Sequence, residues 1–109
     1  MLSIYPAIFY KEKDGSFSVI FPDLNHLATD GRDFNEAMTM AVDCLAGYIY
    51  SEKKDGNSIP APTPIEEVKI ISEGNELDDY ETAFVNAVTV DVEIYAKNFF
   101  DSDEMKNAV

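Results

Sequence analysis

The sequence predicts a single α+β domain in which one amphipathic helix covers an antiparallel sheet. Two short runs rich in β-branched and aromatic residues flank an Asp-Gly turn near the start of the chain. A long segment with apolar residues at three- and four-residue spacing follows, and a valine-rich alternating run comes later. The expected order is strand, strand, strand, helix, strand, helix (β-β-β-α-β-α). The length of 109 residues suits one domain.

A three-stranded antiparallel meander is expected first. Residues 3–10 (SIYPAIFY) and 17–21 (FSVIF) predict two strands, and Asp14-Gly15-Ser16 supplies the turn that joins them. Pro22 ends the second strand because proline has no N–H to donate to a ladder. Residues 24–29 then return as a third strand before the next Asp-Gly pair.

An amphipathic helix is expected from Asp33 to about Lys54. Asp33 can cap the first-turn amides while Glu36 reaches back, and lysines at the other end suit the negative end of the helix. The apolar stripe that should lie on the sheet comprises Phe34, Ala37, Met38, Ala41, Leu45, Tyr48 and Ile49.

The second half of the chain supplies a connector, a further strand and a short helix. Alternating prolines within residues 60–64 favour an extended connector. Residues 68–71 (VKII) suggest a short strand, and residues 73–79 (EGNELDD) suggest an acidic loop. Residues 83–92 (AFVNAVTVDV) alternate as a well-buried strand that should join the meander, and a helix begins after them.

Charge and cysteine content restrict the function. The chain carries 21 acidic and 8 basic residues, a formal charge of −13 that repels phosphate backbones and attracts basic proteins. An acidic surface that only keeps the protein soluble, without a basic partner, would explain the same charge. The single cysteine, Cys44, allows no intramolecular disulfide, and the N-terminus lacks a secretory pattern, so a cytoplasmic location is expected. No apolar run is long enough to cross a bilayer.

The sequence contains no catalytic or metal-binding motif that would identify an enzyme. His26 is the only histidine and is interpreted as a half-exposed turn residue, while Cys44 falls within the helix and is interpreted as a core residue. No paired-cysteine zinc motif, phosphate-binding loop or dinucleotide-binding turn occurs. No cofactor, metal or catalytic residue is therefore expected.

A metal-dependent nuclease is the alternative that the element order keeps open. A meander followed by a helix matches the first half of a ribonuclease H core, in which acidic residues hold two Mg²⁺ ions. The first strand, however, has no acidic residue up to Tyr10, where such an enzyme needs a central carboxylate. The available carboxylates are interpreted as surface charge: Asp23, Asp30, Asp43 and Asp91.

The order and spacing of these parts resemble the HicB family of antitoxins. In one respect the chain departs from the family: Asn25-His26-Leu27 follows Pro-Asp-Leu, where members commonly have Pro-Gly-Cys. The resemblance spans roughly residues 4–64, and the later valine-rich strand also fits. It is carried by Tyr5-Pro6-Ala7, Asp14-Gly15, Phe21-Pro22-Asp23-Leu24, Thr29-Asp30-Gly31, Phe34-Asn35-Glu36-Ala37 and Ile59-Pro60-Ala61-Pro62.

The resemblance implies a partly ribonuclease H-like domain without catalysis, acting as the antitoxin of a type II toxin-antitoxin pair. Its partner would be a HicA-like, mRNA-cleaving toxin whose active site it occludes. Residues 1–92 would form the toxin-binding domain. Residues 93–109 would be a helical tail or linker, truncated before a DNA-binding module that in longer members dimerises and represses the operon. Homo-oligomers are therefore expected, and a stand-alone acidic adaptor is a further alternative.

Contacts with the toxin are predicted at the end of the second strand and at an exposed strand edge. The turn after this strand places an acidic residue between apolar ones, which suits a basic partner. The predicted contact residues are Tyr10, Phe21, Pro22, Asp23, Leu24 and Asp30.

Overall fold

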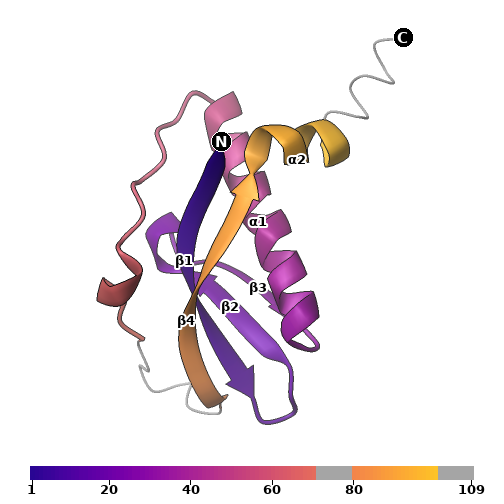
Figure 1. Cartoon of the computed structure of the whole chain (residues 1–109), viewed down its shortest axis with the longest axis vertical. Helices are drawn as coiled ribbons and strands as arrows, with labels where there is room; N and C mark the ends of the chain where they lie inside the picture. The colour runs from indigo at the N-terminus through magenta and orange to yellow at the C-terminus, as the bar shows by residue number, and fades with distance from the viewer. Residues whose placement is uncertain (71–79, 101–109) are drawn as a thin grey trace.

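The computed structural model describes residues 1–70 and 80–100 and confirms the α+β class. Four antiparallel strands form one sheet in the order β3-β2-β1-β4, and helix α1 lies across one face of it (Figure 1). The elements are β1 (Leu2–Glu12), β2 (Phe17–Phe21), the 3-10 turn η1 (Pro22–Leu24), β3 (Leu27–Gly31), α1 (Phe34–Lys54), the 3-10 turn η2 (Ile65–Glu67), β4 (Tyr80–Asp91) and α2 (Val92–Phe99).

Strand β1 is a central strand because its sequence is apolar on both faces. Every side chain from Tyr5 to Tyr10 is buried, whereas the shorter β2 alternates between buried and half-buried positions. β1 pairs with β2 through Ile8 opposite Ile20, and with β4 over the long register from Leu2 opposite Asp91 to Lys11 opposite Thr82. The prediction that the late valine-rich strand joins the meander is thus confirmed.

Helix α1 buries its apolar stripe against the sheet, as predicted. Ala37, Ala41, Leu45 and Ile49 are buried in the core formed with Tyr5, Ala7 and Phe9 of β1 and with Val88 and Val90 of β4. At one end of this core, four aromatic rings lie with centroids 5.3–6.3 Å apart, from Phe9, Phe17, Phe34 and Phe84. The aromatic residues that the sequence gathers near its start therefore serve packing.

The start of α1 is fixed by local hydrogen bonds and by one glycine. The Asp33 carboxylate accepts from the backbone N–H of Glu36 at 2.8 Å, as a cap should. The Glu36 carboxylate accepts from the backbone N–H and guanidinium of Arg32. Gly31 at the end of β3 lets the two elements approach closely, since a Cβ there would lie 2.3 Å from the backbone nitrogen of Ala37.

Several element boundaries differ from the prediction: β1 spans Leu2–Glu12 where residues 3–10 were expected, and three later elements begin at other residues than predicted. β3 begins at Leu27 because Pro22–Leu24 form η1 and the next two residues have left-handed backbone conformations. β4 begins at Tyr80, three residues before the predicted start, and α2 begins at Val92. Residues 68–70 do not form the expected strand, while Ile71 and the predicted acidic loop at 73–79 lie outside the described residues.

Helix α2 follows directly after the C-terminal end of β4 and packs there against α1 (Figure 1). Val92 and Ala96 are buried, and the Tyr95 hydroxyl donates to the Asp43 carboxylate on α1 at 2.8 Å. The predicted domain boundary at residue 92 therefore falls where the chain leaves the sheet and enters a packed helix. None of the helices in residues 1–70 and 80–100 has both the length and the apolar character needed to span a membrane.

Candidate partner-binding site

The turn that follows β2 is fixed to the core by two buried apolar side chains. Phe21 and Leu24 are fully buried, so Pro22 and Asp23 are presented at the surface between two anchors. Asn25 and His26 follow with φ angles of 60° and 56°, a left-handed conformation that is uncommon for residues other than glycine. Asparagine and histidine tolerate it better than most residues, and it directs the chain back into β3.

The proline connector, residues 57–64, passes over this turn and is hydrogen-bonded to it. The Asp23 carboxylate accepts from the backbone N–H of Thr63 at 2.8 Å and from its hydroxyl at 2.6 Å. The Tyr5 hydroxyl donates to the carbonyl of Pro60 at 2.5 Å. Burial raises the pKa of the Tyr5 hydroxyl above its ordinary value, and the negative charge of Asp23 raises it further. The connector is thus part of the folded domain.

A surface pocket of about 380 Å³ lies between the turn, the C-terminal half of α1 and the proline connector. Two carboxylates, two apolar residues, an aromatic ring, an amide and a hydroxyl line it: Asp23, Glu52, Ile59, Pro60, Tyr48, Asn25 and Ser58. Carboxylates beside apolar walls suit a long basic side chain, because the stem packs on the walls while the charged head meets the carboxylates. We call this the acidic pocket.

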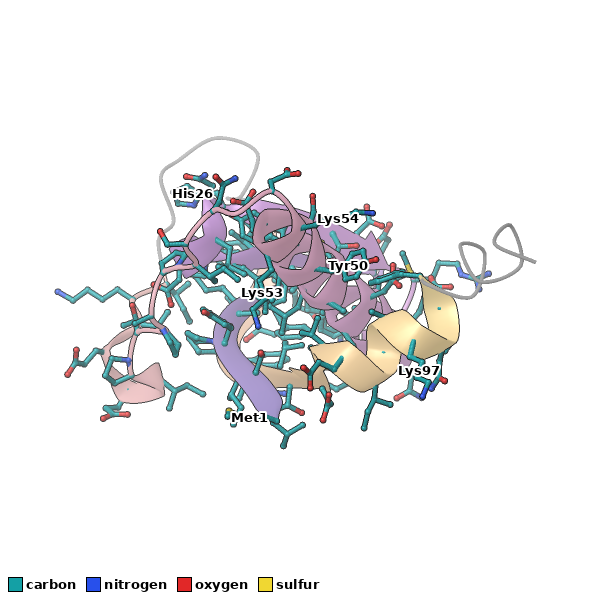
Figure 2. The ribbon with its side chains drawn as sticks, turned by 90° about the horizontal axis from the view of Figure 1, so that it is seen from above. Met1, His26, Tyr50, Lys53, Lys54 and Lys97 are labelled. Carbon is teal, nitrogen blue, oxygen red and sulfur yellow. The ribbon has the colours of Figure 1, made fainter. Side chains whose placement is uncertain are left out.

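The structure places the six predicted contact residues in two separate regions. Phe21, Pro22, Asp23 and Leu24 surround the turn, whereas Tyr10 and Asp30 lie in one cross-strand row at the other end of β2, both opposite Ser18. His26 marks the turn region in Figure 2, well away from Lys97 on α2.

Three of these six predicted contact residues are buried in the structure. Tyr10, Phe21 and Leu24 are 2%, 0% and 0% exposed, so their side chains pack within the domain, and a side-chain contact with a partner would depend on the other three residues. Pro22 and Asp23 are half-buried at the surface, and Asp30 is exposed on β3. These three remain contact candidates.

The carboxylates of the nuclease alternative are dispersed over the molecule. Asp23 bonds Thr63, Asp43 accepts from Tyr95, and Asp91 caps α2 by accepting from the backbone N–H of Ile94. Asp30 stands apart on β3. Among residues 1–70 and 80–100, no group of three His, Cys, Asp or Glu side chains is placed to hold a metal ion. Cys44, expected in the core, is half-buried on α1.

Three residues of the pocket region were not anticipated from the sequence. Tyr48 and Glu52 lie four residues apart, so their shared helix face could have been recognised from the period of α1. Thr63 gave no such signal, because its role depends on the return of the proline connector to a turn 40 residues earlier in the chain.

Comparison with known proteins identifies the family. The model of the HicB-like antitoxin of bacterial toxin-antitoxin systems matches residues 5–100. Antitoxin HicB 1 of Photorhabdus laumondii is 33% identical over 61 residues, which are 56% of this chain and 39% of that protein. The chain thus aligns with about two fifths of the length of this curated relative.

Solved structures agree with this assignment. A chain of a toxin-antitoxin complex from Streptococcus pneumoniae superposes with a TM-score of 0.74 at 27% identity, covering 87% of this chain and 73% of that one. The N-terminal domain of the Burkholderia pseudomallei antitoxin HicB shares the fold, with a TM-score of 0.61 at 19% identity over 82% of this chain and 99% of that one. With a family match over nearly its whole length and the same fold, this chain belongs to the HicB-like antitoxin family.

Proposed function

We propose that this chain is the antitoxin of a type II toxin-antitoxin pair, which binds a HicA-like mRNA-cleaving toxin in the cytoplasm and occludes its active site without catalysis of its own. The observation that carries the proposal is the family match over residues 5–100. The structural similarity to a chain of the toxin-antitoxin complex from Streptococcus pneumoniae also supports the proposal. A second solved structure of this fold, at 22% identity, is the HicA3 and HicB3 toxin-antitoxin complex.

Charge supports a basic partner. A ribonuclease must attract phosphate and is expected to be basic, and a chain with a formal charge of −13 would attract such a protein at long range. Electrostatic attraction of this kind mainly raises the association rate, so affinity has to come from a fitted contact.

Within this proposal, the acidic pocket is the contact for a lysine or arginine side chain of the toxin. Glu52 and Asp23 would pair with the charged head, and Ile59 and Pro60 would cover the aliphatic stem. The hydrogen bonds from Thr63 hold the Asp23 carboxylate in place before binding, which lowers the entropy lost on association.

The test is co-expression with the toxin encoded by the adjacent reading frame, followed by pull-down and an RNA-cleavage assay of the complex. A stable complex in which cleavage is lost is the expected result. Failure to bind a neighbour that is demonstrably toxic would refute the antitoxin proposal and favour an adaptor. If this chain alone cleaved RNA in the presence of Mg²⁺, the proposal that it has no catalytic activity would be refuted.

A matched pair of charge reversals tests the pocket. Glu52→Lys places a positive charge in it, whereas Glu93→Lys makes the same change in net charge on the exposed surface of α2. We expect Glu52→Lys to weaken toxin binding by about tenfold or more, about 1.4 kcal/mol, and Glu93→Lys to change mainly the association rate. Equal losses of affinity in both variants would show that only overall charge matters and would remove the pocket from the interface.

A further inference from the structure

The proline connector has a backbone conformation that its own sequence restricts. Pro60, Pro62 and Pro64 each fix φ at roughly −65° through the proline ring. Ala61 and Thr63 each precede a proline, which excludes the helical conformation and leaves them extended. Pro64 has φ −54° and ψ 136°, near the values of a polyproline II helix. The connector is therefore a stiff polyproline II segment.

One edge of this segment is bound to the domain. A polyproline II helix has about three residues per turn, so residues 60 and 63 lie on the same edge. The Pro60 carbonyl accepts from the Tyr5 hydroxyl. Thr63 donates to the Asp23 carboxylate from its backbone N–H and from its hydroxyl. These hydrogen bonds fix the rotation of the segment about its own axis, and hence which of its residues face outward.

The outward side of the connector is exposed and apolar. Ala61, Pro62 and Pro64 are exposed, and the adjoining Ile65 is 44% exposed. Residues 57–64 carry no charge, although the formal charge of the chain is −13. Neighbouring exposed apolar residues on a stiff backbone are typical of surfaces that a partner covers. We call Ala61, Pro62, Pro64 and Ile65 the proline strip.

The proline strip borders the acidic pocket. Ser58, Ile59 and Pro60, from the first half of the connector, line that pocket. The connector leaves the end of α1 and runs beside the sheet to η2, which contacts β4 (Figure 1). A partner that inserts a basic side chain into the acidic pocket would therefore also lie against the proline strip.

The chemistry of a polyproline II segment indicates what would bind it. Such segments dock in grooves lined with aromatic rings, against which the proline rings pack. Their backbone carbonyls make no internal hydrogen bonds, so they can accept from a tyrosine hydroxyl or a tryptophan indole N–H. Because the connector is already fixed by its prolines and by its bonds to Tyr5 and Asp23, little conformational entropy would be lost on binding.

We propose that the proline strip is a polyproline II docking surface for a groove of the toxin lined by tyrosine or tryptophan side chains. This inference rests on the proposed function, because the toxin is the partner that the acidic pocket would hold. The two surfaces have different roles. The pocket provides a charged contact that orients the partner, whereas the strip provides apolar contact area that does not depend on charge.

Calorimetric titration of the full chain with the toxin encoded by the adjacent reading frame tests the strip. Pro62→Ala removes an exposed proline ring and leaves the residues that bond to Tyr5 and Asp23 unchanged. We expect it to weaken toxin binding by about tenfold. Ile94→Ala is the matched control, since it removes a side chain that is 60% exposed on α2, away from the connector. Its affinity should equal that of the unaltered chain.

Nuclear magnetic resonance detects the aromatic groove directly. In the isotopically labelled chain, the ring protons of Pro62 should move upfield when unlabelled toxin is added, because an aromatic ring would stack on them. Comparison with Pro62→Ala assigns these signals. If the toxin bound the unaltered chain but bound Pro62→Ala equally tightly, or left the Pro62 signals in place, the docking surface would be disproved while the antitoxin function stood. A toxin that did not bind the unaltered chain would overturn both.

Discussion

Substitution of Gly31 by alanine should separate β3 from the start of α1. A Cβ at this position would lie 2.3 Å from the nitrogen and 2.6 Å from the Cα of Ala37, and 2.8 Å from the carbonyl carbon of Glu36. All three are backbone atoms in the first turn of a helix, so no side chain can rotate away. The nearest atom must move by about 0.7 Å to reach even the 3.0 Å limit of real contacts.

The expected cost of Gly31→Ala is about 3 kcal/mol, the upper part of the range for overpacking, because the clash displaces a buried helix end. For a domain of this size, that corresponds to a fall in the melting temperature of about 12 °C or more. Gly47→Ala is the control, since its Cβ would meet only the Phe100 ring at 4.0 Å in the middle of α1. It should stabilise the chain by about 0.5–1 kcal/mol.

Urea unfolding followed by circular dichroism measures both variants. If Gly31→Ala lost less than about 1 kcal/mol while Gly47→Ala behaved as expected, the close approach of β3 to α1 would not be a fixed feature of the fold. The reasoning from backbone contact would then be refuted.

The cap of α1 and the contact between the two helices give two further predictions. Asp33→Ala removes the acceptor for the N–H of Glu36 and should cost about 1 kcal/mol in urea unfolding, whereas Asp33→Asn should lose much less. Burial and the hydrogen bond to Asp43 raise the pKa of Tyr95 to about 12, so its hydroxyl stays protonated in the folded chain above pH 10. The stability that this contact adds is complete below pH 10 and is lost as the pH rises towards 12. Ultraviolet titration should detect one tyrosine that ionises late, and this tyrosine should be missing in Tyr95→Phe.

The parts of the fold that were predictable are those whose causes are local. The limits of α1 follow from Asp33 at its start and the lysines at its end, and its period identifies the buried face without any tertiary information. The hairpin follows in the same way from the Asp14-Gly15 turn. β3 was placed too early because the left-handed conformations of Asn25 and His26 have no regular sequence signal.

The candidate site was less predictable because it depends on tertiary contacts. The sequence marks Phe21 and Leu24 as neighbours of Asp23 but does not show that their side chains are buried in the core while the Asp23 carboxylate bonds Thr63 of the proline connector. The return of the proline connector to Tyr5 and Asp23 joins segments 40 and more residues apart. Such contacts are fixed by packing, so the pocket emerges only in the folded chain.

The pairing of β1 with β4 also has a consequence for the order of events during synthesis. β1 can pair with β2 as soon as the hairpin leaves the ribosome, but its other edge waits for residues up to Asp91, which follow Phe21 by 70 residues. At roughly 5–20 residues per second, the central strand is half-paired for roughly 4–14 seconds. A nascent chain interrupted before β4 would expose the most apolar strand of the sheet, so the complete sheet forms only when translation has passed the last strand.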